Sequence, residues 1–171
     1  MPNSEVIVLD TSVLCVWLKI AGMDSCGPDE DRWDFERADL RIKEALSQGA
    51  TLCLPLATII ETGNHIAQSS ERYERALDLA TLMTKTADAE SPWAAFTDQD
   101  TLWSKEKLKE LAESWPPLAC SELSLGDATI KDVADYYGKM GYRVSLLTGD
   151  QKLAAYQPPP PPLIPRRRSR Q

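Results

Sequence analysis

The sequence predicts a single α/β domain built as three layers, α/β/α, with a central, mostly parallel sheet between helices. Short β-branched runs alternate with longer amphipathic runs along the chain, which is typical of strands joined by crossover helices. The runs EVIVLD and RVSLLT are compact and apolar, as expected of strands that are buried on both faces. The length of 171 residues suits one domain with its own core.

The predicted elements follow from local sequence signals. Residues 22–34 contain Gly, Pro and five acids, which indicates a loop. Gly49 ends the helix before the second strand, and Pro116 with Pro117 is expected to end a later one. Gly138 and Gly141 close the helix that follows. Strands are predicted at 5–10, 51–54 and 143–148, and helices at 11–20, 33–48, 57–68, 70–86, 101–114, 125–137 and 152–156.

The composition changes abruptly after Gln157. Five prolines are followed by LIP and then by RRRSRQ. A proline run favours an extended polyproline II rod, and the arginines beyond it cannot form a core. We therefore predict a domain at residues 1–157 and an appendage at residues 158–171.

The predicted domain is acidic. The formal net charge is −7, and four of the nineteen basic residues lie within 166–170, which leaves fifteen against twenty-six acidic residues up to Gln157. Such a body attracts nucleic acid poorly, because binding to phosphates needs Lys and Arg. Any function on nucleic acid has to overcome this charge.

Other classes of protein are disfavoured by what the sequence lacks. The four cysteines form no C-x-x-C pair, so neither a zinc site nor a disulfide framework is expected. No run of eighteen apolar residues exists, and the N-terminus does not have the pattern of a signal peptide. We expect a cytoplasmic protein without a membrane span.

Two carboxylates directly follow two predicted strands. Asp10 follows EVIVL, with Thr11 and Ser12 beside it, and Asp150 follows RVSLLTG, with Thr148 two residues earlier. In parallel α/β sheets, sites form beyond the carboxyl ends of the strands. An Asp after a strand is also a common helix N-cap. Both interpretations remain open for each residue.

Two further acids are weaker candidates. Asp127 lies on the same helical stripe as Ile130 and Ala134, so it is predicted to face inward, either as a metal ligand or in a capping box with Ser124. Glu61 lies off the stripe of Ile59, Gly63 and Ile66, so periodicity alone predicts that it faces solvent. His65 follows Glu61 by four residues, and we interpret it as a helix-surface residue, since Glu-x-x-x-His alone is not a zinc motif.

Together, IVLDTSVL, LPLATIIETGNHI, LSLGDATI and LLTGD resemble the motifs of the PIN-domain family, small metal-dependent nucleases that include the toxins of toxin–antitoxin pairs. The resemblance covers residues 5 to about 153. It implies an acidic quartet of Asp10, Glu61, Asp127 and Asp150 that acts as catalytic centre and metal site. Thr11, Ser12, Asn64 and Thr148 match polar positions that often accompany the quartet.

The resemblance implies an endoribonuclease that uses Mg²⁺ or Mn²⁺. Carboxylate oxygens suit these hard cations, which activate water for attack on a phosphodiester. Possible partners are RNA, an antitoxin or other regulatory protein, and a second copy of the chain. Candidate contacts to phosphate are Lys19, Lys152, Arg166, Arg167 and Arg168, and Lys131 and Arg143 also lie close in sequence to the motifs.

Other functions remain as alternatives. A haloacid dehalogenase-type phosphatase needs a second acid two residues after the first, where this chain has Ser12, and a P-loop or Rossmann protein needs glycines after the first strand. A structure-specific DNA nuclease has the same kind of acidic site. The rival from another class is a PIN-like interaction module with little or no nuclease activity.

Overall fold

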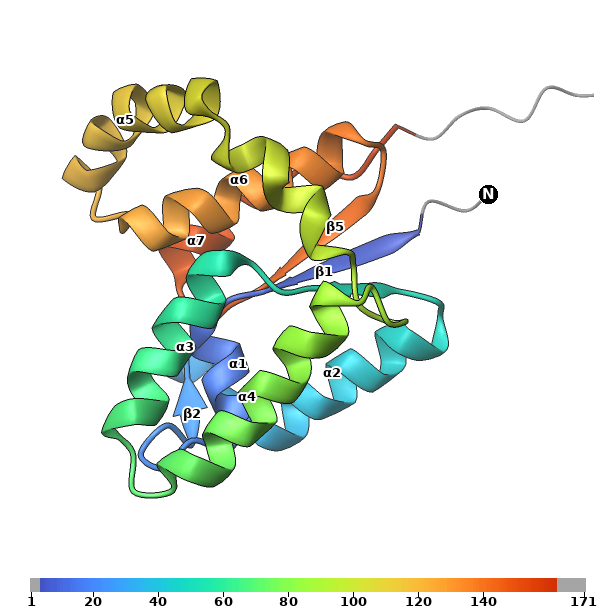
Figure 1. Cartoon of the computed structure of the whole chain (residues 1–171), viewed down its shortest axis with the longest axis vertical. Coiled ribbons are helices and arrows are strands. Elements are labelled where there is room, and N and C mark those ends of the chain that lie inside the picture. The colour runs from blue at the N-terminus through green and yellow to red at the C-terminus, as the bar shows by residue number, and fades with distance from the viewer. Residues whose placement is uncertain (1–3, 163–171) are drawn as a thin grey trace, which may run out of the picture.

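The computed structural model describes residues 4–162, and these form a three-layer α/β/α domain (Figure 1). The central sheet has three parallel strands in the order β4-β1-β5: β4 is Thr51–Cys53, β1 is Glu5–Leu9 and β5 is Arg143–Leu147. The predicted fold class and all three strands are therefore confirmed. Because the strands are parallel, their carboxyl ends lie at one edge of the sheet.

Helices cover both faces of the sheet. Their bounds are α1 Thr11–Trp17, α2 Phe35–Ser47, α3 Leu56–Gln68, α4 Arg72–Ala87, α5 Lys105–Cys120, α6 Leu125–Lys139 and α7 Gln151–Ala154. Two 3₁₀ segments, η1 Asp29–Asp31 and η2 Phe96–Trp103, and two short strands, β2 Ser25–Cys26 and β3 Trp33–Asp34, complete the described elements. None of the described helices is both long and apolar enough to cross a membrane.

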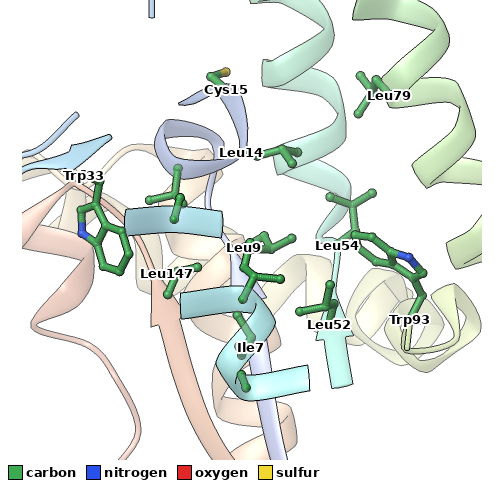
Figure 2. Close-up of a cluster of buried hydrophobic side chains, with 14 of the residues drawn as sticks. Ile7, Leu9, Leu14, Cys15, Trp33, Leu52, Leu54, Leu79, Trp93 and Leu147 are labelled. Carbon is green, nitrogen blue, oxygen red and sulfur yellow. The ribbon is translucent and has the colours of Figure 1, made fainter. Parts of the chain in front are cut away.

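Alternation along β1 divides the core into two halves. Ile7 and Leu9 point into the larger cluster, against residues of α1, α2, α3 and α4 (Figure 2). Val6 and Val8 point to the opposite face, where α6 and α7 pack. All four side chains are almost completely buried. This two-sided burial explains why β1 is a continuous apolar run.

Three predicted boundaries are wrong. Residues 22–34 contain the antiparallel hairpin of β2 and β3 rather than only loop. Pro116 and Pro117 lie inside α5, where the carbonyls that lose a donor belong to exposed residues and can be hydrated. Gly138 is helical, and the chain leaves α6 at Gly141, whose φ of +90° suits glycine.

The two outer edges of the sheet are treated differently. Beside β4, the main chain of Leu52 donates to Pro92 O at 2.8 Å and accepts from Ala94 N at 2.8 Å. Beside β5, Leu146 N donates to the side-chain oxygen Oε1 of Gln157 at 3.0 Å. The β4 edge is thus hydrogen-bonded to main chain. Within residues 4–162, the β5 edge is hydrogen-bonded to the side-chain amide of Gln157.

Candidate active site

The four predicted acids lie around the carboxyl ends of the parallel strands. Asp10 follows β1 and Asp150 lies three residues after β5. Glu61 belongs to α3, the helix after β4, and Asp127 lies in the first turn of α6. Figure 1 shows α1, α3, α6 and α7 meeting near this end of the sheet. The fold therefore brings four segments that are distant in sequence to one region.

Asp10 is the most deeply placed of these carboxylates, with 4% of its surface exposed. Its Oδ2 accepts hydrogen bonds from Ser12 Oγ at 2.6 Å and from Thr148 Oγ1 at 2.7 Å. Ser12 N also approaches Oδ2 at 3.4 Å, so Asp10 is the N-cap of α1. The two hydroxyls tie β1 to the segment that follows β5.

Each of these hydroxyls also accepts a main-chain hydrogen bond from the turn after β5. Gly149 N donates to Ser12 Oγ at 2.9 Å, and Asp150 N donates to Thr148 Oγ1 at 2.9 Å. A hydroxyl has one proton to donate and lone pairs to accept. Two relays, from turn amide through hydroxyl to carboxylate, therefore end on Asp10.

No basic side chain among residues 4–162 balances the charge of Asp10. Burial raises the pKa of its carboxyl group, and the hydrogen bonds from Ser12 and Thr148 offset only part of that effect. Among residues 4–162, no Lys or Arg forms an ion pair with Asp10, Glu61, Asp127 or Asp150. The acids form a region of uncompensated negative charge.

Glu61 turns toward this region, against the prediction from periodicity. Its Oε2 accepts a hydrogen bond from Thr11 Oγ1 at 2.8 Å. A Cβ atom added to Gly126 would overlap Glu61 Oε1, so the carboxylate also lies against the residue before Asp127. The buried stripe of α3 contains Thr58 and Thr62, which a count of apolar residues overlooks.

Asp127 has two sets of neighbours. It forms a capping box with Ser124, whose hydroxyl donates to Oδ2 at 2.7 Å. Burial raises the pKa of Asp127, the Ser124 hydrogen bonds lower it, and the negative charges of Asp10 and Asp150 raise it further. Asp127 thus caps its helix and also lies in the field of two other candidate acids.

Helix capping accounts for part of this arrangement. Asp150 is the N-cap of α7 and accepts from Lys152 N at 2.7 Å, so each of the three aspartates caps a helix. Capping normally uses exposed side chains and local N–H groups. It does not require the burial of Asp10, the bond from Thr148 across 138 residues or the position of Glu61 over Gly126.

The hairpin of β2 and β3 borders the site, which the sequence did not predict. A Cβ atom added to Gly149 would lie 2.7 Å from Cys26 Sγ and 2.8 Å from Gly27 N. The hairpin therefore packs directly on the turn that carries Asp150. The signal for it was weak, because each of its strands has only two residues. All four cysteines of the chain, Cys26 included, are free.

The remaining predicted residues are not gathered at the acids. Asn64 and His65 are exposed on α3. The ammonium group of Lys19 lies over the Phe35 ring, 3.8 Å from its centroid, and Lys152 is paired with Glu122. Arg166, Arg167 and Arg168 lie outside the described residues.

The other two cations close in sequence are also engaged elsewhere. Lys131 forms an ion pair with Asp135 at 2.8 Å. Arg143 begins β5 at the opposite end of the sheet and contacts Glu5 at 3.2 Å. Sequence proximity to the motifs therefore did not bring Arg143 to the site. The region around Asp10 keeps its negative charge.

The donor atoms suit a hard divalent cation in kind, since they are carboxylate and hydroxyl oxygens. The carboxylates are, however, spaced more widely than the ligands of a bound metal ion. Within residues 4–162, no three His, Cys, Asp or Glu side chains are grouped closely enough to hold a metal ion. Like charges repel unless a cation lies between them, so the carboxylates would have to close around one.

Comparison of the chain with protein-family models, with curated proteins and with solved structures finds no match.

Proposed function

We propose that this chain is a divalent-metal-dependent endoribonuclease of PIN-like type, with Asp10, Glu61, Asp127 and Asp150 as its acidic site. The observation that carries the proposal is that no Lys or Arg within the described part of the chain, residues 4–162, forms an ion pair with these acids. Asp10 is buried beside β5, and the pKa of Asp127 is raised by burial and by the charges of Asp10 and Asp150. Burying carboxylates together without a basic partner is costly, which suggests a ligand that brings positive charge.

The side chains have separable roles in this proposal. Asp10, held by Ser12 and Thr148, provides a fixed oxygen ligand. Glu61, oriented by Thr11, and Asp127 would complete the ligand set from the opposite side, with Asp150 at the turn. When bound, Mg²⁺ or Mn²⁺ would orient a water molecule and offset charge on the phosphate.

The acidic body limits how RNA would approach. Lys152 is half exposed beside Asp150 in sequence and pairs with the exposed Glu122, so a phosphate can compete for it at little cost. The arginines at 166–168 would add a second, salt-sensitive contact. Cleavage of short RNA is therefore expected to fall as salt rises.

The test is incubation of the full chain with mixed RNA and DNA oligonucleotides and Mn²⁺, together with titration calorimetry of Mn²⁺. Asp10→Asn and Asp150→Asn should abolish metal binding and lower cleavage by at least about 100-fold, the upper end of the loss seen when groups that support a metal ligand are removed. Asp88→Asn, at an exposed acid of the α4 end, is the control and should behave as wild type.

Other outcomes identify the alternatives. Cleavage of DNA alone, lost in Asp10→Asn, would indicate a structure-specific DNA nuclease. The open spacing of the acids favours a second candidate, a PIN-like interaction module. Wild type that binds neither Mn²⁺ nor Mg²⁺ and cleaves nothing would support that module and overturn the nuclease. Pull-down of a protein that suppresses cleavage would support a toxin with its antitoxin.

A further inference from the structure

Trp103 is an exposed aromatic side chain near the candidate site. It is 42% exposed, whereas Trp93 is 7% exposed and Trp115 donates its indole N–H to Leu123 O at 3.1 Å. Trp103 ends η2, and together with residues at the start of α3 and along α6 it lines a recess. The recess has a volume of only about 10 Å³, which is room for a single water molecule. A larger ligand would therefore lie on the exposed surface of the indole.

Exposed apolar side chains lead from this recess to the acids. Leu56 of α3 and Thr129 of α6 line the recess. One helical turn away, on the same side of each helix, are Ile60 and Leu125, which are 55% and 46% exposed. Each is followed in sequence by one residue of the contact between α3 and α6 at Glu61. The recess is thus connected to the acidic site by an apolar strip.

Asp132 supplies a hydrogen-bond acceptor at the same recess. Within residues 4–162 its one ion pair is with Lys131 at 3.6 Å, which is longer than a hydrogen bond. The ammonium group of Lys131 lies closer to Asp135, at 2.8 Å. Burial is the largest influence on the pKa of Asp132 and raises it, because the carboxylate has lost water without gaining enough donors. Asp132 can therefore accept N–H groups from a ligand that lies on Trp103.

We propose that Trp103 and Asp132 form a subsite for an unpaired guanine base of an RNA strand. The base stacks on the exposed indole, and its N1–H and N2–H groups donate to the two carboxylate oxygens of Asp132. Guanine is the one standard RNA base with two adjacent N–H donors on its Watson–Crick edge. The inference rests on the proposed function, because it takes the same strand to be cut at the acids.

The position of the subsite sets its distance from the bond that is cut. Asp132 follows Asp127 by five residues of α6, which is about 7.5 Å along the helix axis. Neighbouring nucleotides of a strand are about 3.4 Å apart when stacked and farther apart when extended. The guanine is therefore expected one or two nucleotides from the scissile phosphate.

The chemistry of the subsite also suits an acidic protein. A carboxylate that recognises the edge of a base needs no positive surface, whereas recognition of phosphates does. A guanine in a duplex uses its Watson–Crick edge for its own partner, so it is not free to reach Asp132. Unpaired RNA is therefore favoured over duplex RNA.

The test uses fluorescein-labelled, unpaired RNA of about twelve nucleotides, within the size range of single-strand sites. One oligonucleotide has a single central guanine, and three matched ones have inosine, adenine or an abasic residue there. Affinity for the full chain is measured by fluorescence anisotropy without divalent metal, and cleavage is measured with Mn²⁺. Wild type should bind the guanine oligonucleotide about tenfold more tightly than the abasic one and several-fold more tightly than the inosine one, which lacks the N2 amino group.

Substitutions separate stacking from recognition of the base edge. Trp103→Ala should bind the guanine and abasic oligonucleotides equally, and Trp103→Phe should restore most of the difference. Asp132→Asn should lose the preference for guanine over inosine but keep the preference over the abasic residue. Tyr73→Ala, at a tyrosine of α4 that is 75% exposed, is the control and should behave as wild type. The substituted side chains are exposed or half-exposed, and circular dichroism verifies that folding is intact.

The possible failures are distinguishable. Wild type that binds no RNA, or that binds the guanine and abasic oligonucleotides equally, would overturn the subsite, as would an unchanged preference in Trp103→Ala. Cleavage without any preference for guanine would overturn the subsite and leave the nuclease standing. Guanine preference in the metal-free assay, in a chain that neither binds Mn²⁺ nor cleaves, would support the subsite and overturn the proposed nuclease.

Discussion

Strand β1 has a buried acid at its beginning and another just after its end, and the two are treated in opposite ways. Glu5, 7% exposed, accepts from Ser145 at 2.6 Å and contacts Arg41 and Arg143 at 2.5 and 3.2 Å. Asp10, 4% exposed, has hydroxyl and amide donors but, among the residues that the structure describes, no cation. The chain thus neutralises one carboxylate itself and leaves the other without charge compensation.

The pKa values of the two groups express this difference. Burial would raise the pKa of Glu5, but the hydrogen bonds from Ser145 and Arg41 and the charges of Arg41 and Arg143 lower it overall. At Asp10, burial raises the pKa and the hydroxyls do not restore it. A structural role explains Glu5 completely, whereas the uncompensated burial of Asp10 costs stability, as expected if Asp10 belongs to the proposed site.

The largest expected effect on stability comes from removing the charge of Glu5, the acid that Arg41 and Arg143 compensate. Glu5→Gln should lower the free energy of unfolding by about 2–3 kcal/mol, because Arg41 and Arg143 lose their carboxylate; the partial exposure of both arginines keeps the loss near the low end for buried pairs. Urea unfolding at neutral pH measures it. Glu44→Gln, at an exposed acid of α2, should change stability little. Equal effects of the two substitutions would refute the assigned role of Glu5.

Removing the charge of Asp10, the uncompensated acid, should change the free energy of unfolding in the opposite direction. Asp10→Asn should raise the free energy of unfolding of the metal-free chain by about 1 kcal/mol, since the amide oxygen keeps the hydroxyl donors and the charge is removed. A gain of this size corresponds to about 2–4 °C in Tm for a chain of this length. A lower Tm in Asp10→Asn, measured without metal, would mean that the carboxylate is structural.

The dependence on pH separates the two ends further. The lowered pKa of Glu5 means that its stabilisation is complete above its ordinary value of 4.5 and is lost as pH falls through the folded value. The raised pKa of Asp10 means that its ionised form disfavours folding, and this penalty disappears as pH falls toward the ordinary value of 3.8. Urea unfolding from pH 7 to 3 should show the gain of Asp10→Asn shrinking at pH values above 3.8, and the deficit of Glu5→Gln shrinking only as pH falls below about 4.5.

The smallest expected effect on stability is that of Gly126→Ala, a substitution that tests whether Glu61 is a metal ligand. Gly126→Ala places a Cβ where Glu61 Oε1 lies, and this flexible carboxylate can move away. Stability should change by only a few tenths of a kcal/mol, because the helix preference of Ala offsets the displaced side chain. Affinity for Mn²⁺ should nevertheless fall by about tenfold. Calorimetry that shows unchanged affinity would remove Glu61 from the ligand set.

The sequence predicted what depends on local pattern. The β-branched runs of β1 and β5 and the acids that follow them needed only alternation and the geometry of parallel sheets. Periodicity alone assigned Glu61 to the wrong face, although the resemblance placed it in the quartet, because the buried side of α3 is formed partly by Thr58 and Thr62 rather than by apolar residues. Its position over Gly126 depends on two helices that are distant in sequence.

Contacts between distant segments were not predictable from one sequence. The packing of Cys26 against Gly149 and the bond of Gln157 to β5 involve no recognisable motif. Arg143 lies three residues before the motif LLTGD yet at the other end of its strand, because five residues of extended chain span about 16 Å. Sequence distance is therefore a poor guide to which cations meet the acids.

The two hydroxyl relays at Asp10 also have a stereochemical consequence. Ser12 Oγ and Thr148 Oγ1 each accept an amide proton from the 149–150 turn, so their own protons must point toward Oδ2 of Asp10. That oxygen has both of its lone-pair directions filled by hydroxyl donors. An incoming cation would therefore bind the other oxygen, and Asp10 would coordinate it with one atom rather than two.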